Sequence, residues 1–320
     1  MQPRVNIITV HYNSEEDIDE CLGFLLNSTY THFQWWIVDN ASTPHSIQAL
    51  KDLFEKAGVS WVGIPKKDLD KSAEIPDLTK VILIENDCNE GFAAGNNVAL
   101  RQLLKKQTDS LVWLLNPDVA LEPEVMEDLV RLQQGKEKQL LGNVIYYYHQ
   151  RDTVMYCGGF RVKRWQHGVV DIKDLENFKR ADAIAGASLF THLNTFEEVG
   201  LLPEHYFLYW EETDFCYHAK KKGYQFQVNT HSKIYDKVGS AANTSFTREY
   251  LYLLNGMRFY RKYFPLRTPL IFLSTLAKFL KAFLTGQHTK RKAIYFGQID
   301  FLKECFGRDI AIKERIKKHA

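Results

Sequence analysis

Cysteine is scarce in this sequence and follows no pattern. The five residues, Cys21, Cys88, Cys157, Cys216 and Cys305, form no C-x-x-C pair and no zinc-type spacing. An odd, scattered set argues against a disulfide framework and fits reduced thiols in the cytosol. No apolar run reaches the ~20 residues needed to span a bilayer, and residues 1–10 lead directly into an expected strand, so we expect no signal peptide. These absences favour a cytoplasmic protein, or one peripheral on the inner face of the cytoplasmic membrane.

Several motifs that would name a function are also missing. The sequence has no G-x-G-x-x-G and no G-x-x-x-x-G-K-[ST], so neither a dinucleotide site nor a P-loop NTPase is supported. It shows no Ser-His-Asp or Cys-His constellation for covalent catalysis. No recognised nucleic-acid-binding motif accompanies its basic residues, so we expect no nucleic-acid partner.

Charge is distributed unevenly along the 320 residues. The last 75 residues, 246–320, hold 16 Lys and Arg against 5 Asp and Glu, whereas the first 245 hold 25 against 34. A hydrophobic content of 45% is enough for a full core, as one large α/β domain or as a domain with an appendage. We expect a mildly acidic body over 1–245, with halves at about 1–120 and 121–245, and a basic, aromatic extension over 246–320.

Short apolar segments at residues 5–10, 35–38, 81–85 and 111–115 are expected to be buried strands separated by helices. This alternation predicts βαβ units and a mostly parallel sheet. The fourth segment ends in Asn116-Pro117-Asp118. Ligands bind at the carboxyl ends of strands in such sheets, and a carboxylate there suits Mg²⁺ or Mn²⁺. A plain strand followed by a Pro-Asp turn is the alternative for this stretch taken alone.

Residues 89–97, Asn-Glu-Gly-Phe-Ala-Ala-Gly-Asn-Asn, form a glycine-punctuated turn before an expected helix. Such a turn presents backbone N–H groups and the positive end of a helix dipole to a diphosphate. Taken alone, the same pattern also fits a helix start whose glycines serve packing.

The second half has a different pattern. Residues 143–170 are expected to form antiparallel strands, and 182–190 one short strand whose small residues, Gly186 and Ala187, allow close approach. An acidic cluster, Glu211, Glu212 and Asp214, follows the aromatic pair Tyr209 and Trp210. The acids alone are explained equally well by the dipole of a helix start. The aromatic pair favours a sugar-stacking wall beside a catalytic carboxylate.

Taken in order, these motifs resemble family-two glycosyltransferases of the GT-A fold over roughly residues 5–243. The similarity is strongest to the rhamnosyltransferase-like branch that builds bacterial surface polysaccharides such as O-antigen. The resemblance implies an α/β GT-A fold: a mostly parallel central sheet flanked by helices, with a C-terminal helical extension.

The resemblance also implies roles for individual residues. The nucleotide-sugar set is Val10, Tyr12, Asn13, Asp39, Asn89, Gly91, Phe92, Gly95, Asn96 and Asn116. Acceptor binding is expected at Gly186, Ala187, Tyr209 and Trp210, and the general base is expected to be Glu212, supported by Glu211 and Asp214. Asp118 is the implied ligand of Mg²⁺ or Mn²⁺.

One position departs from the family pattern. Asp236 stands where such enzymes often carry a histidine before a Gly-Ser pair. Aspartate can bind the same hard cation, and the alternative is that Asp236 pairs with Lys233 or Lys237. We expect His231, five residues upstream, to be structural.

The basic extension is expected to be helical over about 250–318. Lysines interrupt its most apolar stretch, residues 270–284. Lys and Arg among Phe and Leu suit a helix on an anionic bilayer, close to a polyprenyl-diphosphate-linked acceptor. A helical pair that packs on the body or forms a homodimer is an equal alternative.

The expected activity is inverting, metal-dependent transfer of a sugar from a nucleotide diphosphate onto a glycan or lipid-linked glycan. L-Rhamnose from dTDP-L-rhamnose is the favoured donor. The alternatives are a UDP-hexose transferase of the same fold and a non-catalytic protein that binds a nucleotide sugar or glycan.

Overall fold

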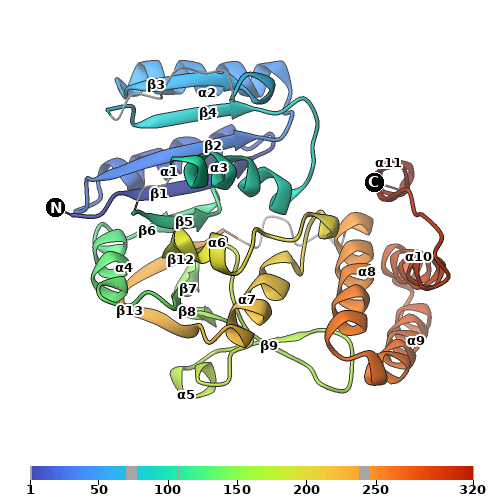
Figure 1. The fold of residues 1–320 in the computed structure, drawn as a ribbon. Coiled ribbons are helices and arrows are strands. Elements are labelled where there is room, and N and C mark those ends of the chain that lie inside the picture. Colours follow the sequence, from blue (N-terminus) through green and yellow to red (C-terminus); the bar gives the residue numbers. More distant parts are fainter. Residues whose placement is uncertain (1, 70–77, 107–108, 238–244, 320) are drawn as a thin grey trace.

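A computed structural model of the chain describes residues 2–69, 78–106, 109–237 and 245–319. Its centre is a ten-stranded sheet in the order β3-β4-β2-β1-β5-β12-β7-β13-β6, with β8 paired to β7. Figure 1 shows this sheet with helices on both sides and the C-terminal helices to one side. The expected GT-A architecture, with its C-terminal helical region, is confirmed.

The first half of the chain builds the parallel part of the sheet. It comprises β1 (Val5–His11), α1 (Glu15–Leu26), β2 (Phe33–Asp39), α2 (Pro44–Ala57), β3 (Trp61–Pro65), β4 (Val81–Glu85), α3 (Phe92–Lys105) and β5 (Leu111–Leu115). Pairing of β1 with β2 and β5, and of β4 with β2 and β3, is parallel throughout. The carboxyl ends of these strands therefore meet along one edge of the sheet.

Two apolar layers cover the sheet, one on each face. Trp35 packs in the layer that contains α1 and α2, whereas Trp36 packs in the layer that contains α3. Alternate residues of a strand point to opposite faces, so adjacent tryptophans serve different layers. Each buried indole N–H has an acceptor: Trp35 donates to Thr9 Oγ1 at 2.8 Å and Trp36 to Asn6 Oδ1 at 3.2 Å.

The second half completes the sheet with mixed pairing. It comprises β6 (Val119–Leu121), α4 (Val125–Gln133), β7 (Gln139–Tyr147), β8 (Gln150–Cys157), β9 (Gly159–Val162), β10 (Val169–Asp171), α5 (Leu175–Phe178), β11 (Ala183–Ile184), β12 (Ser188–His192), α6 (Asn194–Glu198), α7 (Glu211–Lys221) and β13 (Gln225–Asp236). Antiparallel pairing of β7 with β8 and of β9 with β10 confirms the expectation for residues 143–170.

The prediction of a single strand over residues 182–190 is wrong. The segment forms β11, which joins β9 in a second, three-stranded sheet, and β12, which joins the main sheet. The chain leaves one sheet for the other at residues 185–187, where Gly186 lies against the Glu212 side chain and the Ala187 carbonyl accepts a hydrogen bond from the Asn116 N–H. Pairing with two different sheets thus divides an apparently continuous strand.

The extension is helical, as expected, and packs on the body. It consists of α8 (Phe246–Tyr263), α9 (Thr268–Leu284), α10 (His288–Cys305) and α11 (Ile312–His319). Ser245 caps α8 by accepting from the Arg248 N–H, so the expected boundary at residue 245 coincides with a helix start. Tyr206 and Trp210 of the body share one apolar cluster with α8.

Gly256 permits the close approach of α8 to the body. A Cβ at this position would lie 2.2 Å from His167 Nε2 and 2.8 Å from the Trp210 ring. Gly23, in α1, meets nothing within 4 Å.

We therefore expect opposite effects from the same substitution at two helical glycines. Gly256→Ala should lower the free energy of unfolding by about 1–2 kcal/mol, because overpacking outweighs the gain in helix propensity. Gly23→Ala, the matched control, should raise it by about 0.5–1 kcal/mol. Urea unfolding followed by circular dichroism measures both. A Gly256→Ala protein as stable as Gly23→Ala would contradict the close packing of α8.

Candidate active site

A cleft opens at the carboxyl ends of the parallel strands. Its volume is about 310 Å³, and it is lined by seven of the predicted residues: Val10, Tyr12, Asn89, Gly91, Phe92, Asn116 and Asp118. Ser14, Asp17, Asn40, Pro117, Phe207 and Leu208 complete the lining. The structure thus brings together residues from three separate strand ends and from the loop before α7.

Asp39, expected to hold the nucleoside, lies beneath the cleft in this structure. Its side chain is fully buried, and both carboxylate oxygens accept from the Ser42 N–H at 3.2 Å. Asn13 is exposed, with φ +49°, and its Oδ1 accepts from the Thr43 N–H. These two residues shape the loops after β1 and β2.

Gly95 and Asn96 serve the packing of α3 below the cleft. A Cβ on Gly95 would lie 2.9 Å from a Val10 methyl group, so glycine lets α3 rest on β1. Asn96 is buried; its amide donates to the Phe92 carbonyl, and its Oδ1 has no hydrogen-bond partner.

The glycine turn at the start of α3 is locked to the loop before α7. Gly91 has φ +91°, and a Cβ there would lie 2.1 Å from the Phe207 carbonyl oxygen, which accepts from the Phe92 N–H at 2.8 Å. The Gly91 N–H donates to Asn89 Oδ1. Two N–H groups expected to cradle a diphosphate therefore already have acceptors, which leaves that role to the following residues of the first turn.

The loop at residues 207–210 carries backbone strain. Phe207, Tyr209 and Trp210 have φ of +64°, +68° and +78°, a left-handed region that side chains rarely adopt. Asn255 of α8, which is completely buried, donates its side-chain amide to the carbonyls of Tyr206, Leu208 and Tyr209 at 2.6, 2.8 and 3.2 Å. A residue of the C-terminal extension therefore holds the loop that precedes the acidic cluster.

Trp210 does not form the expected sugar-stacking wall. Its ring is 2% exposed and packs among Phe259, Tyr252, Tyr260 and His167, and its Nε1 donates to the Tyr252 carbonyl. Burial against α8 removes it from the cleft surface. Tyr209 is only partly buried and is the aromatic side chain of the pair that remains open to contact.

Glu211 and Glu212 are neighbouring acids at the start of α7. Glu211 is 2% exposed, and its Oε2 has no hydrogen-bond partner. Burial, and secondly the charge of Glu212, raise the pKa of Glu211 well above its ordinary value; burial also raises the pKa of Glu212. Two carboxyl groups with pKa values pushed apart can divide acid and base roles. The pKa is raised more at Glu211, so Glu212 is the acid of the pair that ionises at the lower pH.

Glu212 lies at the end of a chain of contacts that starts at the cleft. It is half-buried, and a Cβ on Gly186 would lie 3.3 Å from its Cγ. The adjacent Ala187 carbonyl accepts from the Asn116 N–H at 3.1 Å. Gly186 and Ala187 therefore link Glu212 to the strand end that carries Asp118.

Asp214 has a structural position rather than one in the cleft. Its carboxylate pairs with Lys262 at 2.7 Å and accepts from the hydroxyls of Tyr206 and Tyr263, each at 2.7 Å. This network joins α7 to α8 on the side facing the extension. The expected support of Glu212 by Asp214 is therefore indirect, through the placement of α7.

Asp118, directly before β6, lies close to Asp236, the last residue of the paired strand β13. Strand pairing sets Asp236 opposite Val119, and the Lys237 N–H donates to the Asp118 carbonyl. The Asp118 Oδ1 is buried without a hydrogen-bond partner, and burial, then the charge of Asp17, raises the pKa of Asp118. Tyr156 donates to Asp236 at 3.5 Å, and both aspartates raise its pKa, after burial.

These two carboxylates fit a hard divalent cation as a partial ligand set. The described residues contain no group of three or more His, Cys, Asp or Glu arranged for a metal, so water and a diphosphate would supply the remaining oxygen ligands. Lys237 pairs with Asp17 and Glu20, and Lys233 lies over the Tyr146 ring. His231, where we expected a structural role, donates its backbone N–H to Asn229 Oδ1.

Sequence reasoning missed Asp17, Phe207, Leu208 and Asn255. Asp17 belongs to the acidic first turn of α1, and the helix dipole is a sufficient explanation for acids at that place. Asn255 offers one signal, a polar side chain in the apolar run 250–257 of an expected helix.

Comparisons with known proteins identify the family of the chain. The family model for glycosyl transferase family 2 matches residues 6–191, more than half of the chain. A low-salt glycan biosynthesis hexosyltransferase, Agl10 of Haloferax volcanii, is 22% identical over 223 residues, which cover 68% of this chain and 62% of that relative.

Solved structures share the fold. Mannosyltransferase PcManGT from Pyrobaculum calidifontis, in complex with GDP-Man and Mn²⁺, has a TM-score of 0.57 at 15% identity, covering 95% of this chain and 88% of that one. GalNAc-T7 with UDP, GalNAc and Mn²⁺ has a TM-score of 0.57 at 12% identity, over 80% and 51% of the two chains. S. aureus TarS 1–349 with UDP-GlcNAc has a TM-score of 0.52 at 16% identity, over 94% and 81%. With its matched family model and its strand-end cleft, the chain belongs to glycosyl transferase family 2.

Proposed function

We propose that this protein is an inverting glycosyltransferase that uses a nucleotide-diphosphate sugar, with Glu212 as its base. The observation that carries the proposal is the position of Glu212. It is a half-buried carboxylate with a raised pKa, connected through Gly186 and Ala187 to the strand end that bears Asn116 and Asp118. A module that only binds a nucleotide sugar has no need of this base.

The reaction is a single displacement. Glu212 takes the proton from an acceptor hydroxyl while that oxygen bonds to the anomeric carbon of the donor sugar. The bond between that carbon and the diphosphate oxygen breaks, and the nucleoside diphosphate leaves. One displacement inverts the anomeric configuration, and no covalent sugar–enzyme intermediate forms.

Asp118 and Asp236 would hold Mg²⁺ or Mn²⁺ at the diphosphate end of the cleft. The bound cation supplies electrostatic stabilisation of the diphosphate leaving group. The buried, unpartnered Asp118 Oδ1 supports this assignment.

A hexose is the donor sugar that the comparisons favour. The Haloferax relative is a hexosyltransferase, and the solved neighbours hold GDP-Man, UDP-GlcNAc, or UDP with GalNAc. We therefore favour a UDP- or GDP-hexose as the donor over dTDP-L-rhamnose, which the motif resemblance alone favours. The proposed acceptor is a glycan or a lipid-linked glycan, with Gly186, Ala187 and Tyr209 on its side of the cleft.

The first test measures release of nucleoside diphosphate from UDP-glucose, UDP-galactose, UDP-GlcNAc, GDP-mannose and dTDP-L-rhamnose, with candidate glycan acceptors present and with Mn²⁺ or EDTA. One hexose donor should turn over with metal, and Glu212→Gln should lower kcat by about 100-fold or more because the proton acceptor is lost. Glu197→Gln, an exposed acid on the neighbouring α6, is the control and should keep wild-type activity.

Two outcomes would change the proposal. Turnover of dTDP-L-rhamnose alone would restore the rhamnosyl assignment. Thermal stabilisation by a donor, without turnover of any donor and unchanged in Glu212→Gln, would make the protein a nucleotide-sugar-binding module.

A second prediction concerns pH. Burial raises the pKa of Glu212 above the ordinary 4.5, and a general base must be deprotonated to act. Activity should therefore fall as pH falls through this raised pKa, which places the acid limb of the kcat profile above 4.5. Glu211→Gln should leave the limb in place, because Glu211 stays protonated while Glu212 titrates. A limb that disappears in Glu211→Gln would transfer the base role to Glu211.

A third prediction concerns Asp118→Asn. In the metal-free protein this change should raise the Tm, since it removes a carboxylate whose ionised form is disfavoured by burial and by Asp17. It should also weaken Mn²⁺ binding in the presence of UDP by about tenfold or more, because an anionic ligand is lost. Differential scanning fluorimetry and Mn²⁺ electron paramagnetic resonance measure the two effects. Unchanged Mn²⁺ affinity would remove Asp118 from the metal site.

A further inference from the structure

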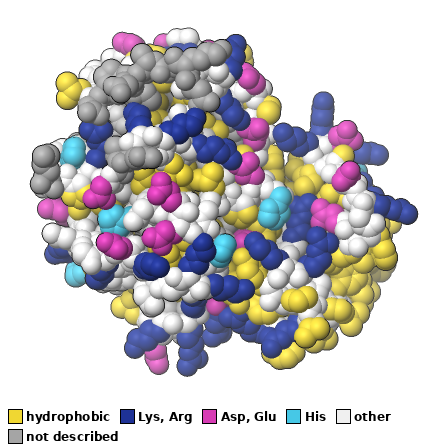
Figure 2. All heavy atoms as spheres, in the orientation of Figure 1, with side chains coloured by type: hydrophobic (Ala, Val, Ile, Leu, Met, Phe, Trp, Pro, Cys, Tyr) yellow, Lys and Arg dark blue, Asp and Glu magenta, His cyan; other side chains and the backbone are white. Residues whose placement is uncertain are grey.

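Helix α9 exposes an apolar face that points away from the rest of the molecule. Ile271, Thr275 and Ala282 are its buried residues. The opposite face carries Leu270, Leu273, Leu276, Leu280, Phe283 and Leu284, which are 38–82% exposed, and Leu266 just before the helix is 96% exposed. Figure 2 shows hydrophobic side chains gathered over this corner, with Lys and Arg beside them. Contiguous apolar surface of this kind marks an interaction site.

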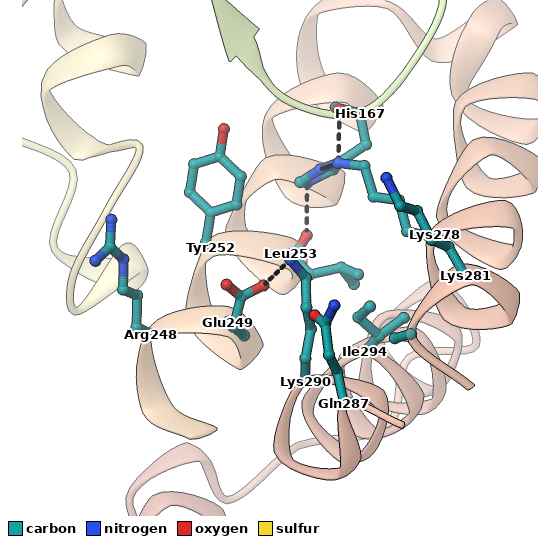
Figure 3. A pocket seen from close by; sticks show the side chains of 11 residues that line it. His167, Arg248, Glu249, Tyr252, Leu253, Lys278, Lys281, Gln287, Lys290 and Ile294 are labelled. Atoms are coloured by element: carbon teal, nitrogen blue, oxygen red, sulfur yellow. Dashed lines mark hydrogen bonds and ion pairs between the residues drawn. The ribbon is translucent and has the colours of Figure 1, made fainter. Parts of the chain in front are cut away.

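A basic pocket borders this face. Its volume is about 460 Å³, and it lies between α8, α9, α10 and the loop that carries His167. Arg248, Lys278, Lys281 and Lys290 line it, and Glu249 is the acidic residue of the lining. Figure 3 shows these side chains around the hollow. The lining of the pocket thus carries an excess of positive charge.

The charges in the pocket are incompletely compensated. Glu249 lies 3.9 Å from Lys290. Lys278 contacts His167, donating to its carbonyl oxygen at 2.8 Å, and burial followed by repulsion from Lys163 lowers the pKa of Lys278 to about 8. Burial disfavours the charged form of Lys278, and an anionic oxygen bound in the pocket would stabilise that charged form again.

The sequence around the face has a single sign of charge. From residue 264 to residue 299 there are six Lys and Arg and no Asp or Glu. Trp165, 62% exposed, lies under the Arg267 guanidinium at 4.2 Å near the start of α9. Tryptophan and arginine at the rim of an apolar face are typical of the membrane–water interface.

We propose that α9 and the adjoining basic pocket form a docking surface for an anionic bilayer. The leucine face enters the boundary between headgroups and acyl chains, and the pocket receives a lipid phosphate. Pairing with a second copy through the same face would oppose two basic rims, so charge favours an anionic lipid surface. No helix of the described residues is long and apolar enough to cross the membrane, so docking places α9 in the plane of the interface.

An anionic bilayer would be a partner of the proposed transferase, and binding to it can be measured without sugar transfer. The full chain is sedimented with phosphatidylcholine vesicles and with vesicles that also contain phosphatidylglycerol. We expect binding to the anionic vesicles, weakened by salt because exposed charges are screened. Inorganic phosphate, added at the same concentration as the lipid phosphate, should leave binding to the anionic vesicles intact, because the apolar face also contributes.

Matched variants separate the two components. Leu280→Glu should reduce partitioning by about tenfold or more, since burial of a leucine is lost and a repelled charge is added. Leu175→Glu, on α5 and similarly exposed at 53% against 57%, is its control and should bind as wild type. Lys281→Gln should reduce partitioning about fivefold, whereas Lys56→Gln, an exposed lysine on α2, should not.

Three results would overturn the proposal. The first is absence of binding to anionic vesicles, and the second is equal loss in Leu280→Glu and Leu175→Glu. The third is a dimer, detected by light scattering, that Leu280→Glu converts to a monomer, because the face would then be an interface between copies. Nucleoside diphosphate release from a donor, assayed without vesicles, reports separately on the proposed activity.

Discussion

The loop that precedes α7 and the acidic cluster depends on one side chain of helix α8. The Asn255 amide donates to the carbonyls of Tyr206, Leu208 and Tyr209, in a loop where three residues with side chains have left-handed φ values. Each such residue costs about 1–3 kcal/mol. The two N–H groups of the amide are shared among the three carbonyls, and each returns about 0.5–1.5 kcal/mol. Burial of Trp210 against α8 supplies further stabilisation. The extension is therefore part of the scaffold that positions α7 and Glu212.

The acids of the cleft divide into two groups according to their partners. Asp214 is neutralised by Lys262 and by two tyrosine hydroxyls, and its role is to fix α7 against α8. Glu211, Glu212 and Asp118 form no salt bridge within the described residues, and burial raises the pKa of each. Carboxyl groups perturbed in this way are candidates for ligand binding or proton transfer. The presence or absence of a paired cation, more than position in the sequence, separates the structural acid Asp214 from the candidate catalytic and metal-binding acids.

Sequence patterns predicted the parts of the molecule that depend on local periodicity and strand ends. Runs of apolar residues located β1, β2, β4 and β5, and the polar residues after them located the cleft. The patterns failed where a distant contact decides the outcome. Trp210 is buried because Phe259 and Tyr260 pack on it from α8, and the buried Asp39 carboxylate lies 3.9 Å from His11 Nε2 of β1. The 182–190 segment is divided because the Ala185 N–H donates to the Gly158 carbonyl beside β9, whereas the Ala187 carbonyl accepts from Asn116 in the main sheet. None of these partners is adjacent in sequence.

Helix α8 also sets the geometry between the cleft and the proposed docking surface. Asn255 faces the strained loop, whereas Arg248 and Glu249 face the basic pocket. Tyr252 joins the two sides: its carbonyl accepts from Trp210 Nε1, and its hydroxyl accepts from the Val169 N–H beside the pocket-lining loop. Close-packed aromatic contacts resist displacement, so a lipid phosphate bound at Lys278 or Lys281 would hold the cleft at one orientation to the bilayer. An acceptor anchored in the same membrane would then approach Glu212 from a limited range of directions, and part of the entropic cost of aligning it would already be met by docking.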